Sequence, residues 1–558
     1  MQSVSTAQEI AVEPKGFRLR VKAESLEILV DDVAYFHLPV RSSVGIERGE
    51  ADRDLPVLSA EAGQSEGRRF FTWTTRSNLW EKKVYRLDLY PQAFAYRVTV
   101  SGRGRLGKIE YFSGAEANEV PEAGYEVGRY LEPHPGGGPL SLPQYRSVLQ
   151  PGRVGLGYLV PTLLAFPFTL SAPGHPWLAL GLAPRPGEYD LDHFATGPQT
   201  SAGSGRIVFS TDFLGYKQVD GEYQLPAIVG TTGPDEYASL EAHAEWLYDF
   251  GGCRRRDWSD SPRWWYGPLF CGWSEQATFP GPMADAATQA NYTVMSQRLD
   301  ELGLEPTAII IDAKWQRTNG EGLPDPEKWP DLRGFVEAQH ARGRRVLLWF
   351  KAWNTEGLPA EECINLWGQP LGTDPNSAAY RQRVREMMAT LLGEGEGCCN
   401  CDGFKVDFAN VMPLGRDLSG TTSSYGIELL KQWFELFYNA AKAVKPDCLV
   451  NNSCAHPYFA EVTDQARLHD YAGSLRAAWE VMSFRQRLFR AALPGVLIDT
   501  DGVISSHRET MDYLRRAPQL GVPDLYRLTQ AGNPPLAAED WAEIREVWRK
   551  YSAGLDSA

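Results

Sequence analysis

From residue 263 to about residue 530, short apolar segments alternate with amphipathic segments of helical spacing. This rhythm is typical of a parallel sheet, and eight strands in about 260 residues is the size of a (β/α)8 barrel. The expected strands are 267–273, 307–312, 345–350, 403–407, 448–453, 465–470, 495–499 and 523–526. A doubly wound open sheet is the alternative, but no Gly-rich phosphate loop follows any of these segments. The barrel is therefore the predicted fold of this half of the chain.

The first half of the chain has a different pattern. From residue 16 to about residue 230, short segments of period-two alternation are separated by Gly and Pro turns, which predicts a large β-sandwich. A Pro- and Gly-rich loop at 132–139 is interpreted as a connector rather than a lid. The chain is thus expected to be β and then α/β, with four parts: a sandwich (1–235), a helical linker (236–262), the barrel (263–530) and a C-terminal helix and tail (531–558).

Composition narrows the class of partner. The formal net charge is −15 and no long basic block is present, which argues against nucleic acid. No apolar run approaches the roughly twenty residues of a membrane span, and residues 1–9 do not resemble a secretory signal, so a cytoplasmic protein with reduced thiols is expected. The 17 Trp, 24 Tyr and 23 Phe residues favour a carbohydrate ligand, because Trp and Tyr faces stack on sugars. A homo-oligomer is compatible with the sequence.

One strand end carries the clearest chemical signal. Lys405 and Asp407 lie two positions apart in the segment 403–407, so they share one side of a strand whose carboxyl end would lie at the active-site face of a barrel. A carboxylate beside a lysine stays ionised at neutral pH and is a candidate nucleophile. The ordinary alternative is an Asp that only begins a loop.

A second carboxylate would complete the apparatus for glycoside hydrolysis, in which one carboxyl protonates the leaving oxygen and the other attacks the anomeric carbon or activates water. Asp470, at the end of the sixth expected strand, is the preferred acid/base, and Asp464 is its rival. A retaining enzyme would hold its two carboxyls about 5 to 5.5 Å apart.

Five blocks of sequence resemble the successive motifs of glycoside hydrolase family 36, the α-galactosidases and their relatives, in the clan of families 27 and 31. The blocks are Ile311-Asp312-Ala313-Lys314-Trp315, Leu348-Trp349-Phe350-Lys351, Phe404-Lys405-Val406-Asp407, Ser453-Cys454 and Gln465-Ala466-Arg467-Leu468-His469-Asp470. In the family they read I-D-D-G-W, L-W-F-E, K-W-D-M-N, S-C-S-G-G-G and Q-x-W-T-S-D.

The resemblance implies a retaining α-galactosidase-like hydrolase that needs no cofactor and acts on a small or oligosaccharide α-glycoside. By position, Asp407 matches the nucleophile and Asp470 the acid/base. Asp312, Lys405 and Cys454 match sugar-contacting positions, and Trp273 and Trp349 would wall the pocket. Arg467 and Asn452, at neighbouring strand ends, are added as candidate substrate contacts.

The departures from the family pattern surround the presumed sugar pocket. Ala313 stands where a second Asp is usual, Lys351 where a Glu is usual, and Ala455-His456-Pro457-Tyr458 replaces a glycine run. We therefore expect retained chemistry with altered specificity, and galactose is only the default sugar. An α-glucosidase or a transglycosylase of the same clan, and a noncatalytic carbohydrate-binding relative, are the alternatives.

The other reactive side chains have ordinary interpretations. Asp499 and Asp501 contact substrate or only form a turn. His456, His469 and His507 are not at metal-ligand spacing. Cys398, Cys399 and Cys401 would lie at the opposite end of the barrel, where structural cysteines, free or paired, are the default and a zinc site or disulfide is the alternative. We expect no metal, and metal-assisted hydrolysis near Asp312 and Asp407 is a second enzymatic alternative.

Overall fold

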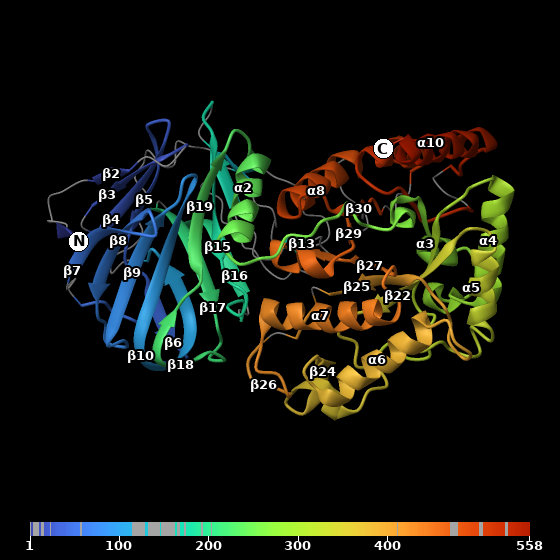
Figure 1. The fold of residues 1–558 in the computed structure, drawn as a ribbon, viewed down its shortest axis with the longest axis horizontal. Helices are drawn as coiled ribbons and strands as arrows, with labels where there is room; N and C mark the ends of the chain where they lie inside the picture. Colours follow the sequence, from blue (N-terminus) through green and yellow to red (C-terminus); the bar gives the residue numbers. More distant parts are fainter. Residues whose placement is uncertain are drawn as a thin grey trace.

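Figure 1 shows two bodies side by side in the computed structural model, a β-rich half coloured blue to green and a barrel coloured green to red. The structure describes residues 2–3, 10–12, 16–22, 24–55, 59–113, 129–131, 145–146, 162–163, 168–171, 174–190, 193–201, 204–409, 411–413, 415–468, 478–501, 506–529 and 534–557. The loop 132–139 and the residues His469 and Asp470 lie outside these ranges. No helix in the described ranges is both long enough and apolar enough to cross a membrane.

The N-terminal half is the predicted sandwich, built from a large and a small antiparallel sheet. The large sheet has 14 strands: β1 (Gln2–Ser3), β6 (Ser43–Ile46), β7 (Ser59–Ser65), β8 (Arg68–Thr75), β9 (Lys82–Leu89), β10 (Ala93–Tyr111), β11 (Arg129–Leu131), β12 (Tyr145–Arg146), β14 (Phe168–Ser171), β15 (Trp177–Ala183), β16 (His193–Ser201), β17 (Ser204–Asp212), β18 (Gln218–Gln224) and β19 (Ala227–Gly233). The small sheet is β2 (Ile10–Val12), β3 (Arg18–Val21), β4 (Ser25–Val30) and β5 (Val33–Pro39).

Alternation decides which side chains fill the sandwich. In β9 every second residue is buried, and β3 repeats the pattern on the small sheet. The long strand β10 pairs with β9 and β19 in its first half and with β6 and β17 in its second half, so it joins parts of the sheet that are far apart in sequence. The period-two pattern of the sequence is thus confirmed as a sandwich core.

The C-terminal half is a closed barrel of eight parallel strands: β20 (Leu269–Cys271), β21 (Ala308–Ile311), β22 (Arg345–Lys351), β25 (Gly403–Asp407), β27 (Leu449–Asn452), β29 (Gln465–Arg467), β30 (Leu497–Asp499) and β31 (Asp524–Leu525). A parallel bridge between Asp499 and Val522 joins the last two strands and completes the ring. All eight predicted strands are confirmed, and the open-sheet alternative is excluded.

Helices surround the barrel: α3 (Trp273–Gln276), α4 (Gln289–Leu302), α5 (Leu332–His340), α6 (Ala378–Leu392), α7 (Gly426–Val444), α8 (Ala478–Ala492), α9 (His507–Arg516) and the closing α10 (Ala538–Ser557). Several begin where the sequence supplies a cap: the side chains of Thr288, Asp331, Ser377 and Ser506 each accept a backbone N–H of the first turn. Short 3-10 turns occur at η1 (Arg263–Tyr266), η2 (Met283–Ala286), η3 (Ala360–Glu362), η4 (Pro457–Val462) and η5 (Ala517–Gln519).

Two loops at the carboxyl end of the barrel join to form a small antiparallel sheet. Strands β23 (Cys363–Leu366) and β24 (Gln369–Thr373) come from the loop after β22, and β26 (Leu418–Ser419) comes from the loop after β25. The amide N–H of Thr421 donates to the Asp374 carboxylate (2.6 Å), a second link between the loops. The rim above the third and fourth strands is therefore one structure rather than two free loops.

The barrel interior is a packed apolar layer with a polar layer above it. The apolar layer consists of Trp265, Leu269, Cys271, Ala308, Ile310, Leu347, Leu449, Leu497, Val522 and Tyr526. Gly403 allows the close approach of two strands there, because a Cβ at this position would lie 2.1 Å from the Leu449 carbonyl oxygen. Charged side chains toward the carboxyl ends of the strands form the polar layer.

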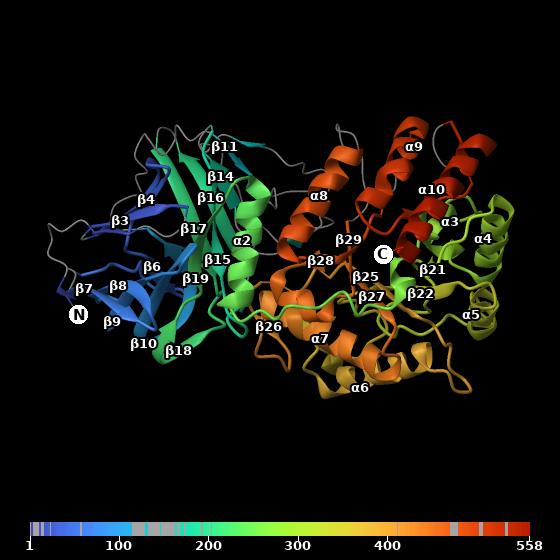
Figure 2. The same ribbon diagram turned by 45° about the horizontal axis from the view of Figure 1, so that its top comes forward.

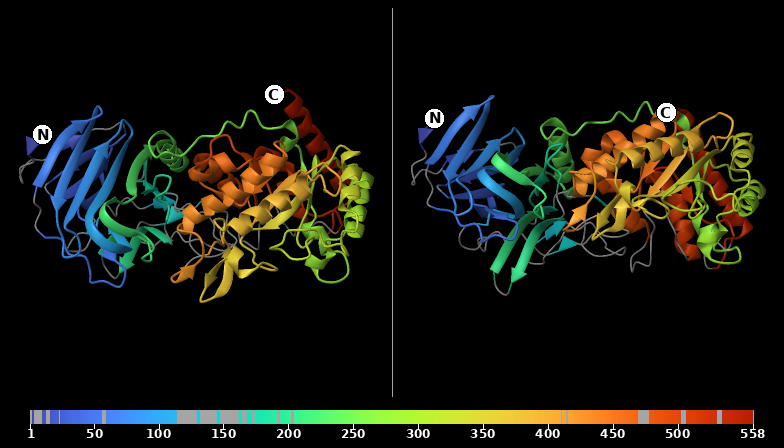
Figure 3. Two further views of the ribbon diagram at one scale, coloured as in Figure 1. Left: turned by 60° about the horizontal axis from the view of Figure 1, so that its bottom comes forward. Right: turned by 90° about the horizontal axis from the view of Figure 1, so that it is seen from below.

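The two halves are joined by a helix and by side-chain contacts. Helix α2 (Glu236–Asp249) packs on β19 and β15 of the sandwich and on α8 of the barrel (Figures 1 and 2). The rings of Tyr189 and Tyr458 stack at 4.3 Å, and the Gly187 amide donates to Glu428 (3.0 Å). Two short strands, β13 (Thr162–Leu163) and β28 (Cys454–Ala455), pair in parallel across the junction. Figure 3 shows the sandwich lying beside the barrel rather than over one end of it.

Candidate active site

Asp407 ends β25 at the carboxyl face of the barrel, as predicted. Its Oδ1 accepts from the Phe408 amide (3.0 Å) and from Arg467 Nη2 (2.6 Å), and its Oδ2 accepts from Trp349 Nε1 (3.2 Å). Trp349 reaches the carboxylate from the neighbouring strand β22, whereas Arg467 reaches it from β29. The Asp407 side chain is 15% exposed, so it reaches the solvent although three N–H donors hold its carboxylate.

Arg467 bridges two carboxylates. Besides Asp407, its guanidinium donates through Nη1 to Asp501 Oδ2 at 2.7 Å, and the Arg467 side chain is only 2% exposed. Asp501 follows β30 with a left-handed φ of 50° and is fully buried, and its amide donates to Asp499 Oδ1 (2.8 Å). A planar guanidinium suits such two-carboxylate bridging. Asp501 therefore belongs to the polar layer and does more than begin a turn.

A second buried ion pair lies beside the first. Lys405 Nζ contacts Asp312 Oδ2 (2.9 Å), Tyr526 Oη (3.0 Å) and Cys271 Sγ (3.3 Å). Burial is the largest influence and disfavours the ammonium form, but Asp312 and the smaller contributions of Cys271 and Asp501 together raise the pKa of Lys405 well above its usual value. Burial and then the Asp312 charge raise the pKa of the Cys271 thiol, which keeps it neutral. The other Asp312 oxygen accepts the Ala313 amide (2.8 Å), so both oxygens of this carboxylate have protein partners.

Two further aspartates complete the polar layer. Asn451 Nδ2 donates to Asp499 Oδ2 at 2.7 Å. Burial, followed by the charge on Asp501, raises the pKa of Asp499 to about 6. Burial, followed by Asp499 and Asp501, raises the pKa of Asp524 well above its usual value, and the Asp524 side chain is only 1% exposed. The layer thus holds more carboxyl groups than cations, and part of this excess is relieved by protonation.

The structure brings Asp407, Arg467, Trp349, Asp312 and Lys405 into this layer. Three other predicted residues lie apart from it. Trp273 begins α3 above β20 and packs on the apolar layer, Cys454 is buried in β28 at the junction with the sandwich, and Asn452 donates to the Val462 carbonyl (2.9 Å). Asp470 lies outside the described residues.

Strand phase explains the position of Asn452. In the sheet register Lys405 pairs with Asn451 and Val406 pairs with Asn452, so Asn451 is the residue that shares the interior face with Lys405. Asn451, and not the predicted Asn452, therefore faces the barrel interior. Asn451 contacts Asp499 and also donates to Gln465 Oε1 (3.0 Å).

Asp464, the alternative acid/base, lies at the start of β29, at the amino-terminal end of the barrel. Its carboxylate contacts Arg256 (2.7 Å) and Lys442 (2.7 Å) and accepts from the Val450 amide (2.8 Å). A fully paired carboxylate at the opposite end from Asp407 has a structural position and is too remote to act on the same bond.

Sequence reasoning missed Cys271, Tyr526, Asn451 and Asp524, and for Asp501 it left open a substrate contact or a turn. Each of the four lies in or directly beside a barrel strand, so counting alternate positions back from the strand ends would have found them. No group of three or more His, Cys, Asp or Glu side chains in the described ranges is placed to hold a metal ion. Cys398, Cys399 and Cys401 are free thiols below β25.

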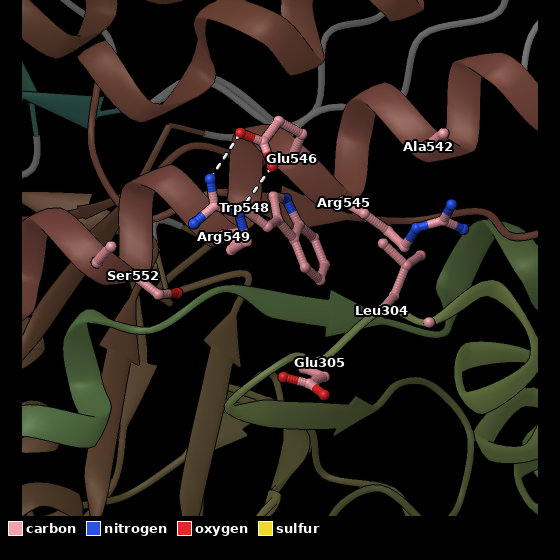
Figure 4. Close-up of a pocket in the computed structure, with 10 residues that line it drawn as sticks. Leu304, Glu305, Ala542, Arg545, Glu546, Trp548, Arg549 and Ser552 are labelled. Atoms are coloured by element: carbon pink, nitrogen blue, oxygen red, sulfur yellow. Dashed lines mark hydrogen bonds and ion pairs between the residues drawn. The ribbon is translucent and has the colours of Figure 1, made fainter.

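A pocket of about 570 Å³ lies elsewhere on the molecule (Figure 4). Its wall includes Leu304 from the turn after α4 and Arg545, Trp548 and Arg549 from α10. The charged side chains there have local partners: Arg549 pairs with Glu546 (2.7 Å), and Arg545 donates to the Leu302 carbonyl (2.7 Å). Because none of the strand-end carboxylates lines it, we place the candidate chemistry at Asp407.

No protein-family model and no curated protein matches this sequence. Solved structures do match, and they are similar over nearly the whole chain. A family 36 α-galactosidase from Geobacillus stearothermophilus in complex with raffinose is 11% identical with a TM-score of 0.58, covering 98% of this chain and 86% of its own. The α-galactosidase from Lactobacillus brevis is 12% identical with a TM-score of 0.55, covering 98% and 83%.

A third structure has a similar length. The α-galactosidase from Thermus thermophilus in complex with stachyose is 16% identical with a TM-score of 0.53, covering 88% of this chain and 99% of its own. A β-arabinopyranosidase also matches, at 11% identity and a TM-score of 0.51. At such low identity the similarity concerns the fold alone. The chain has the sandwich-and-barrel fold of family 36 glycoside hydrolases, which confirms the resemblance seen in the five motifs.

Proposed function

We propose that this protein is a retaining glycoside hydrolase that cleaves a terminal α-linked sugar. The observation that carries the proposal is Asp407, a partly exposed carboxylate at the carboxyl end of the fourth strand in a barrel of the family 36 fold. Active sites of such barrels lie at that face. Fold alone does not fix function, so the proposal rests on this carboxylate and its surroundings.

In the proposed mechanism Asp407 attacks the anomeric carbon while Asp470 protonates the departing oxygen, which gives a covalent glycosyl-enzyme. Asp470 then removes a proton from water, the water attacks the same carbon, and Asp407 leaves. Trp349 Nε1 and the Phe408 amide hold the nucleophile in place. The Lys405–Asp312 ion pair lies in the same polar layer, and this mechanism needs no cofactor.

The residues of the site support the type of reaction more directly than the identity of the sugar. α-Galactosides are the default, because the similar structures include α-galactosidases in complex with raffinose and stachyose. The β-arabinopyranosidase of the same fold is a reminder that pocket side chains decide the sugar. Transfer to a second sugar in place of water uses the same residues.

One observation favours a second candidate, a noncatalytic carbohydrate-binding protein. Arg467 lies 2.6 Å from the carboxylate that would attack, and a guanidinium so close reduces the electron density available to a nucleophile. In that case the barrel would bind a sugar without cleaving it.

The test is a panel of 4-nitrophenyl α-glycosides with the wild type, Asp407→Ala and the control Asp417→Ala on the exposed rim. We expect Asp407→Ala to lose at least about 10⁴-fold in kcat, as for other catalytic nucleophiles. Azide should restore turnover of this variant and yield the glycosyl azide of inverted configuration, because azide replaces the missing carboxylate. Sugar binding without cleavage anywhere in the panel would establish the noncatalytic alternative.

A further inference from the structure

Lys351 is a cation at the mouth of the barrel that has no anionic partner among the residues that the structure describes. It ends β22, and the sheet register pairs it with Asp407, so both side chains leave the sheet on the same side. No carboxylate of the described residues lies within 4 Å of its Nζ, and no acceptor there hydrogen-bonds to it. Its Nζ lies over the Phe408 ring, 5.1 Å from the ring centroid.

Neighbouring lysines differ in this respect. Lys405 pairs with Asp312 (2.9 Å), Lys314 with Glu356 (2.7 Å) and Lys328 with Asp285 (3.2 Å). Lys351 is half-buried as a residue, and none of the described carboxylates pairs with its ammonium. A cation without a protein counter-ion is available to an anionic group that arrives with the ligand.

The carboxylates beside Lys351 do not exclude an anionic ligand. Asp407 and Asp501 are bridged by Arg467, and Lys351 is the register partner of Asp407 on the neighbouring strand. Asp312 has little to offer the hydroxyls of a neutral sugar, because Lys405, Cys271 and the Ala313 amide already contact its oxygens. The next side chain, Ala313, has no acceptor.

From this arrangement we infer that the sugar cleaved at this site carries an anionic substituent, and that Lys351 binds it. The inference rests on the proposed function and names its substrate class: a glycoside of a sugar acid, with a carboxylate on the ring, or of a sugar bearing a sulfate ester. Both substituents present oxygens to one ammonium group, so one lysine serves either.

The experiment compares kcat/KM for 4-nitrophenyl α-D-galactopyranoside, the corresponding α-D-galacturonide and the 6-sulfate. The enzymes are the wild type, Lys351→Met, Lys351→Glu and the control Lys82→Met, which removes one exposed positive charge from the sandwich. We expect the wild type to favour one anionic substrate at least about 10-fold. Lys351→Met should lose about 10- to 100-fold on that substrate, mainly through KM, and should change less than about twofold on the neutral one.

Lys351→Glu should prefer the neutral galactoside, and Lys82→Met should behave as the wild type. The ratio of kcat/KM for the galacturonide to kcat/KM for the 6-sulfate shows which anion is bound. A wild type that cleaves the neutral galactoside as efficiently as both anionic substrates overturns the inference and leaves the proposed function intact.

If no glycoside is cleaved, the proposed function fails, and calorimetry with galacturonate and galactose decides the binding claim separately. Binding of the acid that Lys351→Met abolishes supports a role for Lys351 in anion recognition. Equal binding of both sugars, or of neither, overturns it. Thermal unfolding of each variant within about 2 °C of the wild type shows that Lys351 is not needed for the fold.

Discussion

The two ends of strand β25 carry aspartates with opposite surroundings. Asp402, just before the strand, contacts His340 (2.7 Å) and Lys445 (3.2 Å) and accepts from the Val346 amide (2.9 Å). Although burial opposes ionisation, these partners lower the pKa of Asp402 below its usual value. Asp407, at the other end, shares the Arg467 guanidinium with Asp501.

The same contrast extends around the barrel. Asp464, at the amino-terminal end, is bound by two cations, whereas Asp499 and Asp524, toward the carboxyl end, have raised pKa values. At the amino-terminal end of the barrel the carboxylates are paired with cations and stabilise the fold. At the carboxyl end several carboxyl groups lie close together, and their mutual repulsion reduces stability. Carboxyl groups that reduce the stability of the fold are expected mainly at functional sites.

The largest expected effect separates activity from stability. Asp407→Asn should reduce kcat by at least about 10⁴-fold, because the amide cannot act as the nucleophile, and it should lose less thermal stability than Asp402→Asn because Arg467 keeps its contact with Asp501. Asp402→Asn should lower the thermal stability and leave kcat nearly unchanged. Turnover and thermal melting of both variants are the measurement, and an active Asp407→Asn enzyme would contradict the contrast between the two ends.

Next in size is the loss of a structural carboxylate. Asp464→Asn leaves Arg256 and Lys442 without their buried counter-ion, so the free energy of unfolding should fall by about 3–5 kcal/mol. Urea unfolding measures it, and kcat of the remaining folded protein should stay within about threefold. A variant as stable as the wild type but inactive would return Asp464 to the role of acid/base.

The sign of the pH dependence should differ between the ends. The pKa of Asp499 is raised from 3.8 to about 6, so between these values the folded state keeps a proton that the unfolded chain has released. Asp499 therefore reduces stability as the pH rises through this window, and the reduction is constant above it. Relative to the wild type, Asp499→Asn should gain up to about 3 kcal/mol between pH 4 and 6.5.

Asp402→Asn provides the opposite control. Because the pKa of Asp402 is lowered, its contribution to stability is present above the ordinary value of 3.8 and is lost as the pH falls through the folded-state value. The variant should therefore be less stable than the wild type at pH 7, and the difference should narrow in acid. Urea unfolding at several pH values tests both variants, and parallel curves for the two would contradict the comparison.

The smallest effect concerns the arginine that bridges the two carboxylates. Arg467→Met should lower kcat by about 10- to 100-fold, because Asp407 loses the contact that orients Oδ1, and Arg467→Lys should recover part of the loss by keeping the charge. KM should change less than kcat, which separates orientation of the nucleophile from binding. Faster turnover by Arg467→Met would mean that the guanidinium restrains the nucleophile.

The fold could be predicted from the sequence because it is encoded locally. Each barrel strand is a short apolar run between turns, and Asp407 could be placed because its strand and Lys405 lie beside it in the sequence. The Arg467–Asp501 contact could not be predicted, since it depends on how β29 and β30 are staggered in the closed barrel. The prediction falls on Asn452 and misses Asn451 because a one-residue error in strand phase exchanges the two faces of a strand.

The small sheet of β23, β24 and β26 also bears on how this protein could be redesigned. Lys351 precedes one of the loops that form the sheet and Asp407 precedes the other, so the proposed anion partner and the proposed nucleophile are attached to a single rim. A loop transplanted alone from a relative would break the pairing of Leu366 with Leu418 and the bond from Thr421 to Asp374. Specificity is therefore best exchanged as one cassette, with residues 352–377 and 408–425 moved together.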